Sequence, residues 1–464
     1  MEGKGRFGFI VGLVLALLFV TPFNASAQEK LRKEIRELKE RIQQLEKNVE
    51  KNQEESKAFR ALKEKFEHLS IGGGVTGIIQ GADMDSGWDD DDAADGSYSA
   101  DLEVEVDMDR WGTGFLHLET GDGDGVTDEI GCLTGTNADA MGGMENDLEI
   151  SEALWTFGLL DDRLNLTAGK LDPVTLMDDN RVAKDETTQF MADIFVDQLA
   201  MEWPDDYTPG FQAVVAPCDF FDLKMVALSA DTDWEDLFNH MFYGAEIAVH
   251  PEFNGLEGNY RLYGWGNDRH HVEWGDVADE IEGYSGLDPK AYYDDEDNYG
   301  IGLSIDQRVA SDITLFARYG WQNDDIAAAV EEEASEGDRE GAWIFDENGD
   351  LSFEPYGAVE QSWSVGGQIT GERWSRPDDV FGMAVGMAMI NDDYEDYLED
   401  YADNRLVDGA EGDAGDELHF EAYYSFCLNE YLAVSLDTQI IDNPRGDEDA
   451  DTVYMAGLRT QISF

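Results

Sequence analysis

The chain ends on Val453-Tyr454-Met455-Ala456-Gly457-Leu458-Arg459-Thr460-Gln461-Ile462-Ser463-Phe464, and its side chains alternate in character. Counted back from Phe464, every second position suits an apolar environment: Ile462, Thr460, Leu458, Ala456 and Tyr454. The positions between them suit water: Ser463, Gln461, Arg459 and Gly457. A period of two over about 10 residues predicts a strand with one apolar and one wet face. The last strand of a soluble sandwich would show the same alternation, so the rest of the chain has to separate the two folds.

The beginning of the chain predicts export. Lys4 and Arg6 precede an apolar run at 7–20, and Ala25-Ser26-Ala27 offers small residues for cleavage. This pattern indicates a secretory signal peptide over residues 1–27. No cysteine follows the cleavage site, which argues against a lipoprotein, and no later run reaches the 18 or so apolar residues of a spanning helix. An exported chain can still cross a membrane as a closed barrel, because closure pairs every backbone donor and acceptor.

Composition excludes several classes of protein. The formal net charge is −72, with 103 acidic and 31 basic residues, and nucleic-acid binding needs a basic footprint. A hydrophobic fraction of 42% with 11% aromatic residues argues against disorder. Removing 27 residues from 464 leaves 437, a normal length for a large barrel. The three cysteines are an odd number and give no disulfide framework, so isolated thiols are the simpler interpretation: Cys132, Cys218 and Cys427.

Residues 28–69 differ in kind from the rest of the chain. They are rich in Glu, Lys, Arg and Gln, and apolar residues recur at alternating spacings of four and three: Leu31, Ile35, Leu38, Ile42, Leu45 and Val49. This heptad seam predicts a periplasmic coiled coil. Glu34 with Lys39, and Arg41 with Glu46, are opposite in sign across g and e positions, which favours parallel chains. The β-branched a positions favour two strands, whereas barrels of this kind usually form trimers; a single amphipathic helix lying on the barrel is the alternative.

From about residue 70 onward, short strands alternate with Gly- and Asp-rich loops. Seventeen segments resemble strands, and we predict 16 because bacterial single-chain barrels use even numbers; Gln198–Trp203 is the least secure and could belong to an inward-folded loop. Short links such as 428–430 alternate with long ones such as 267–298, which is the outer-membrane arrangement. The predicted fold is an all-β transmembrane antiparallel barrel over residues 70–464. Trp residues near strand ends suggest aromatic girdles, or alternatively a sugar-stacking track in the lumen.

One strand carries an unusual face. In Asp101-Leu102-Glu103-Val104-Glu105-Val106-Asp107-Met108-Asp109 every even position is apolar and every odd position is a carboxylate. Carboxylates in one ladder repel each other across neighbouring rungs. A wide, water-filled lumen tolerates that ladder, whereas a packed core would not. We therefore predict that five side chains line a pore that prefers cations: Asp101, Glu103, Glu105, Asp107 and Asp109.

Two stretches resemble the carbohydrate-selective porin family of the outer membrane. One comprises Gly169-Lys170-Leu171-Asp172-Pro173 and residues 178–190, Asp-Asp-Asn-Arg-Val-Ala-Lys-Asp-Glu-Thr-Thr-Gln-Phe. The other comprises Glu421-Ala422-Tyr423-Tyr424, Asp442-Asn443-Pro444 and the closing strand. The resemblance spans roughly 70–464 and implies passive diffusion of small hydrophilic solutes, with contacts to outer-membrane lipids and to the outer-membrane assembly machinery, for which Phe464 would be the signal. The coiled coil is similar to that of relatives that contact the cell wall.

In such porins the first stretch folds toward the channel. The resemblance therefore implies constriction residues: Asp178, Asp179, Asn180, Arg181, Lys184, Asp185 and Glu186. Opposed charges across a constriction would orient polar solutes. Alternatively, Arg181 and Lys184 only neutralise neighbouring acids and fix the loop.

Other sites are weaker. The acidic loop at 122–128 lacks the Gly and Glu positions of an EF-hand, and residues 346–350 fail in the same way. His270-His271 beside Glu273 has no second metal anchor. No histidine lies in a recognisable catalytic motif, so we expect neither an enzyme nor a cofactor nor a resident metal. The alternatives to a sugar porin are a cation or siderophore uptake porin and, in a different class, a coiled-coil structural protein or adhesin of the envelope.

Overall fold

A computed structural model describes Lys39, residues 68–83 and residues 93–464 except 142–143, 145, 205–206, 233, 236, 275–289, 293–296, 330–340, 344–355, 396–413 and 449. The chain divides into two compact units, Met1–His68 and Leu69–Phe464. The predicted signal peptide and the coiled-coil seam lie outside the described residues, as does Asp346-Glu347-Asn348-Gly349-Asp350.

The second unit is a closed antiparallel barrel. Its main sheet has 17 strands, of which β9 (Glu252–Phe253) pairs only with β10, and the remaining 16 form the wall in the described residues. These are β1 (Leu69–Asp83), β2 (Ala93–Asp107), β3 (Thr113–Asp122), β4 (Glu149–Leu159), β5 (Leu164–Leu171), β6 (Thr208–Cys218), β7 (Phe221–Ser229), β8 (Met241–Val249), β10 (Leu256–Asn267), β13 (Asn298–Ala310), β14 (Ile313–Gln322), β17 (Val359–Gly371), β18 (Arg376–Ile390), β19 (Glu417–Asn429), β20 (Leu432–Asp442) and β21 (Val453–Ser463). Closure satisfies the sheet edges that an open sheet would leave unpaired.

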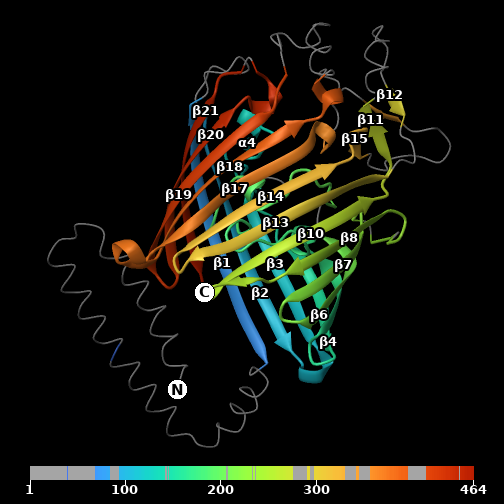
Figure 1. Ribbon diagram of the computed structural model, residues 1–464, viewed down its shortest axis with the longest axis vertical. Coiled ribbons are helices and arrows are strands. Elements are labelled where there is room, and N and C mark those ends of the chain that lie inside the picture. Colours follow the sequence, from blue (N-terminus) through green and yellow to red (C-terminus); the bar gives the residue numbers. More distant parts are fainter. Residues whose placement is uncertain are drawn as a thin grey trace, which may run out of the picture. The chain divides into compact units, whose positions relative to one another are not determined.

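The two ends of the sheet meet along β1 and β21, the blue and red strands of Figure 1. Their register runs from Gly74 opposite Ser463 to Asp83 opposite Tyr454. The terminal residue extends this seam, because Phe464 N donates to Gly73 O at 3.0 Å and Gly73 N donates to Phe464 O at 3.2 Å. A Cβ on Gly73 would lie 3.0 Å from the Phe464 ring, so glycine leaves room for that ring.

Side chains on the closing strand alternate as the sequence predicted. Tyr454, Leu458 and Ile462 are exposed on the outside of the wall, whereas Arg459 is 1% exposed and Gln461 accepts a hydrogen bond from Thr76 Oγ1 of β1 inside it. Toward the end of the strand the outward residues are mainly apolar and the inward ones polar, which is the pattern of a barrel in lipid. Near its start, the inward Val453 and Met455 join a buried apolar cluster. Among the described residues, no helix is long and apolar enough to cross a membrane.

The other predicted strands also correspond to the wall, with one exception that the sequence had already marked as insecure. Gln198–Trp203 forms no strand and belongs to an inward-folded loop. The acidic strand begins at Ala93 and ends at Asp107 rather than Asp109. Within the described parts of the long loops, four additional strands pair β11 (His271–Glu273) with β15 (Ile326–Ala329) and β12 (Lys290–Tyr292) with β16 (Gly341–Trp343). The links between strands are short at one end of the barrel and long at the other.

Buried apolar clusters lie inside the barrel, between the wall and two inward-folded segments, 123–141 and the loop at 172–204. The apolar residues of this loop, including α5 (Asp193–Val196), face inward-pointing side chains of β14, β18 and β19. Phe190 is central: its ring centroid is 5.4 Å from that of Phe195, 5.6 Å from that of Phe316 and 5.1 Å from that of Tyr423. A loop with such a core is held against the wall as a fixed part of the structure.

The prediction that tryptophans near strand ends form aromatic girdles is only partly correct. Trp111 and Trp374 are exposed at strand-connecting turns. Trp265 is buried, and Phe242 stacks on it at 6.0 Å and on Trp203 at 5.7 Å. Trp203 and Trp265 therefore pack within a core cluster, because the loop at 172–204 supplies apolar partners there.

We expect Phe190→Ala to lower the thermal stability of the barrel, because deleting a buried phenylalanine costs about 3–5 kcal/mol. Phe211→Ala is the matched control, since the Phe211 ring is 54% exposed on the outer wall. Heat-modifiable mobility on gels and thermal unfolding in detergent would measure the difference. Equal losses in the two variants would mean that the Phe190 cluster does not stabilise the fold.

Candidate functional site

The acidic residues of β2 share one face of the strand. Ser97 and Ser99 lie on that face, and their hydroxyls bond to the inward-folded segment 123–141, Ser97 with Asn137 at 2.9 Å and Ser99 with Asp139 at 3.0 Å. Period-two alternation puts Asp101, Glu103, Glu105 and Asp107 on the same, lumen-facing side.

Asp109 does not continue this face. It lies in the 3-10 turn η2 (Asp109–Trp111), with φ at 50°, and its backbone N–H donates to Asp107 Oδ1 at 2.9 Å. The prediction that Asp109 belongs to the acidic face is wrong, because the strand ends two residues earlier and the chain turns.

Strands β3 and β4 add further polar groups beside Asp101 and Glu103, the part of the acidic face farther from the turn η2. Asp101 is opposite Glu119, Glu103 is opposite His117, and His117 is opposite Glu152. The carboxylate of Glu119 accepts hydrogen bonds from Ser151 Oγ at 2.7 Å and from Tyr207 OH at 2.9 Å. This side of the lumen is therefore rich in carboxylates, some exposed, such as Glu103, and some held by protein hydrogen bonds, such as Glu119.

Two of the predicted constriction residues are buried anchors of the loop. Asp178 pairs with Arg318 Nε at 2.8 Å and accepts a hydrogen bond from Tyr263 OH at 3.1 Å. Asn180 donates to Ser304 Oγ at 3.2 Å and accepts from Val182 N at 3.2 Å. Both side chains are enclosed between the loop and the wall, and their polar groups bond to the wall and to the loop itself. They therefore hold the loop in place.

The predicted cations are also paired. Arg181 lies 3.4 Å from Glu257 Oε2 and 3.5 Å from Asp306 Oδ1, and it stays partly exposed. Lys184 Nζ pairs with Asp197. These ion pairs are the contacts expected if Arg181 and Lys184 neutralise neighbouring acids. Arg181 is also exposed enough to contact a solute, as a constriction residue would be.

The remaining acids of the stretch differ in exposure. Asp179 is 55% exposed and pairs with Arg261 at 3.2 Å. Asp185 Oδ1 accepts from the backbone N–H of Thr187 at 3.0 Å and of Thr188 at 3.1 Å, which closes a turn. Burial, with Asp185 and Asp139 nearby, raises the pKa of Glu186 to about 8, so this side chain is largely neutral at pH 7.

The residues that fix the loop were missed from the sequence. Arg318 of β14 donates to Phe195 O at 3.0 Å and Ala183 O at 2.8 Å, and Arg459 of β21 donates to Gln189 O at 2.6 Å and also to Glu186 O. Their sequence signal is a lone arginine on the polar face of an otherwise uncharged strand segment.

Wall carboxylates perform the complementary task by accepting backbone N–H groups. Glu421 accepts from Met191 N at 2.7 Å and from Ala192 N at 3.0 Å. Glu417 accepts from Leu133 N at 2.9 Å and from Thr134 N at 2.8 Å, which anchors the segment 123–141. Loop backbone in the lumen thus finds acceptors and donors on the wall.

Other positions considered from the sequence serve structural contacts. His271 is buried, with Nε2 3.0 Å from Glu202 Oε2, and Asn298 donates to the same oxygen at 2.7 Å. Asp122 accepts a hydrogen bond from the Asn146 side chain.

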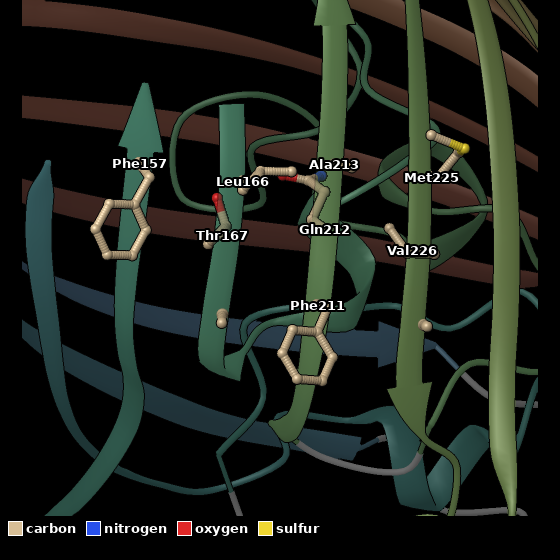
Figure 2. A pocket seen from close by; sticks show the side chains of 10 residues that line it. Phe157, Leu166, Thr167, Phe211, Gln212, Ala213, Met225 and Val226 are labelled. Atoms are coloured by element: carbon tan, nitrogen blue, oxygen red, sulfur yellow. The ribbon is translucent and has the colours of Figure 1, made fainter. Parts of the chain in front are cut away.

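An apolar pocket of about 350 Å³ lies on the outside of the wall, over β4 to β7. Figure 2 shows the rings of Phe157 and Phe211 at its rim. The neighbouring Gln212 belongs to the other face, where it donates to Leu176 O at 3.1 Å. The pocket therefore faces away from the lumen and offers nothing to a polar solute.

Comparison with known proteins finds a matching family model and similar solved structures. The model of the carbohydrate-selective porin, OprB family matches residues 91–464. The high-pH structure of Pseudomonas putida OprB is 17% identical, with a TM-score of 0.69, covering 87% of this chain and 96% of that one. The low-pH structure of the same protein has 13% identity and a TM-score of 0.48, covering 89% and 97%. The outer-membrane channel DcaP of Acinetobacter baumannii has 11% identity and a TM-score of 0.46, covering 85% and 97%. No curated protein matches the sequence.

We expect Arg318→Met to release the loop at 172–204, because removing one partner of a buried ion pair costs about 3–5 kcal/mol. Trypsin cleavage at Arg181 or Lys184 in the folded barrel would report the release. Arg163→Met is the matched control, since Arg163 is exposed in a turn and bonds to Pro217 O. A loop that stays resistant in the Arg318 variant would contradict the anchoring role.

Proposed function

The chain belongs to the carbohydrate-selective porin, OprB family and is an outer-membrane porin for small solutes, and from that premise we propose that it passes neutral sugars by passive diffusion and prefers cations over anions. The observation that carries the cation preference is the acidic face of β2, formed by Asp101, Glu103, Glu105 and Asp107. Charged groups that line a pore favour counter-ions. The proposal includes no catalytic activity and no cofactor.

The balance of paired and unpaired charges supports this preference. Among the described residues, Glu103, Glu105 and Asp107 are exposed and make no ion pair, so their field reaches the water of the lumen. The wall arginines differ, because Arg318 and Arg459 are buried and directed at loop carbonyls. Unpaired acids and sequestered bases together raise the local cation concentration.

Sugar passage rests on hydrogen-bonding groups rather than on a net field. Neutral sugars are insensitive to the sign of the pore charge and need donors and acceptors along the path. Arg181 and Asp179 on the loop are partly exposed and offer both kinds of group beside the paired residues. Constriction by Arg181, Lys184, Asp185 and Glu186 is part of the proposal.

We further propose that the N-terminal segment lies in the periplasm and joins protomers through the seam Leu31, Ile35, Leu38, Ile42, Leu45 and Val49, most simply as a trimer. The opposite charges across the g and e positions support parallel chains. Recognition by the outer-membrane assembly machinery would use Phe464, and the coiled coil would supply any cell-wall contact.

Replacing Glu103, Glu105 and Asp107 by the corresponding amides should move the reversal potential in a salt gradient most of the way toward zero. The shift of the wild-type channel should also shrink at high salt, because the Debye length falls to about 3 Å near 1 M. Planar-bilayer recordings would measure both, with sugars tested as blockers and permeants.

The control for this experiment removes three acids from the turns at the short-link end of the barrel: Asp161→Asn, Asp162→Asn and Glu430→Gln. These side chains are exposed outside the wall, and the same change in net charge should alter the reversal potential far less. A wild-type channel that prefers anions, or equal shifts in both triple variants, would contradict the cation preference. A wild-type channel that prefers cations but passes no sugar would contradict only the proposal that neutral sugars are its solutes.

Deleting Glu29–Val49 should lower the thermal resistance of the oligomer while single-barrel conductance stays measurable. Ile35→Glu with Ile42→Glu should act alike at constant length, because charge at a positions breaks the seam. Arg36→Ala with Gln43→Ala, at outward b positions, is the control. An oligomer of unchanged thermal resistance would show that barrel walls alone hold it together.

A further inference from the structure

Three potential metal ligands converge on the lumen side of β2 and β3: Asp101, His117 and Glu119. One ligand atom from each lies within 4.8 Å of the others. The sheet explains this convergence. Alternation puts His117 and Glu119 on one face of β3, and the register places Asp101 directly opposite Glu119 and diagonal to His117. An imidazole with two carboxylates is a donor set for a divalent transition-metal ion.

The imidazole is oriented from outside this triad. His117 Nε2 lies 3.2 Å from Asp101 Oδ1, while Nδ1 lies 3.8 Å from Glu152 Oε2 on the next strand. Metal-binding histidines commonly direct their second nitrogen at a carboxylate, and Glu152 lies at ion-pair distance from that nitrogen here. Glu152 therefore supplies an observation independent of the three ligands themselves.

The carboxylate of Glu119 is also fixed, by Ser151 Oγ at 2.7 Å and Tyr207 OH at 2.9 Å. Asp139 of the inward-folded segment is 3% exposed and adds a further acid nearby, held by Ser99 Oγ at 3.0 Å. Three carboxylates thus surround one imidazole, those of Asp101, Glu119 and Glu152. Lys170, 5.6 Å from the Tyr207 ring centroid, donates to Ile150 O instead. A bound cation would balance this charge.

We propose that Asp101, His117 and Glu119 bind a divalent transition-metal ion from the lumen, with Glu152 as the positioning residue for His117. Three protein ligands leave a coordination position open to water, and the nitrogen donor favours such an ion over Ca²⁺ or Mg²⁺. A cation held there adds positive charge at the Asp101 end of the acidic face. The ion would therefore reduce cation current, an effect separate from solute diffusion.

The test uses the full chain in detergent and Zn²⁺ as the probe, measured by calorimetry, with Ca²⁺ in parallel. Wild type should bind one Zn²⁺ and Ca²⁺ far more weakly. His117→Gln and Asp101→Asn should abolish the site, and Glu152→Gln should weaken binding by about 10- to 100-fold. His250→Gln is the matched control, because His250 also bonds a carboxylate, Asp222, at 2.8 Å.

Bilayer recordings give a second measurement. Zn²⁺ should lower the cation current of wild type and of His250→Gln, and should leave His117→Gln unchanged. Heat-modifiable mobility identifies any variant that fails to fold, and Glu152→Gln then replaces it as the decisive comparison. Unchanged Zn²⁺ affinity in a folded His117→Gln channel would overturn the site. Current in metal-free buffer tests the diffusion channel independently.

Discussion

The structure depends on one requirement, which is that backbone groups of a loop inside a closed barrel need hydrogen-bond partners. Strands satisfy each other, but the loop at 172–204 joins no strand ladder and much of it is buried against the wall. Unpaired buried N–H or C=O groups cost about 1–3 kcal/mol each. The wall removes that cost with charged side chains, because Glu421 accepts two successive N–H groups of the loop and Arg318 donates to three of its carbonyls.

This requirement divides the lumen into two regions with different electrostatics. On the side of β14, β19 and β21 the charges of the wall are directed at the backbone and the side chains of the loop, as in the pair of Arg318 with Asp178. On the side of β2, among the described residues, the loop forms no ion pair with Glu103 or Glu105, and these acids remain exposed. The same residue type thus serves as an anchor on one side and as a source of field on the other.

The sequence predicted the wall well because wall formation is local. Period-two alternation is set by each strand alone, so the closing strand and the acidic strand were recognisable without knowledge of their neighbours. The end of the acidic strand was placed two residues too late, since alternation continues through Asp109 although the backbone turns there. The loop contacts could not be predicted, because the partner of Asp178 is Arg318, 140 residues away, and no local pattern joins them.

Distance along the chain also explains why the cluster around His117 escaped notice. His117 and Glu119 have the spacing of ligands on one strand face, but two residues at that spacing are common and carry little information. Their significance comes from the register with β2, which brings Asp101 opposite Glu119, and from β4, which brings Glu152 to the other ring nitrogen. Strand order and register therefore turn an ordinary pair of side chains into a site, and they do so where the exposed acids of β2 meet the first of the inward-folded segments.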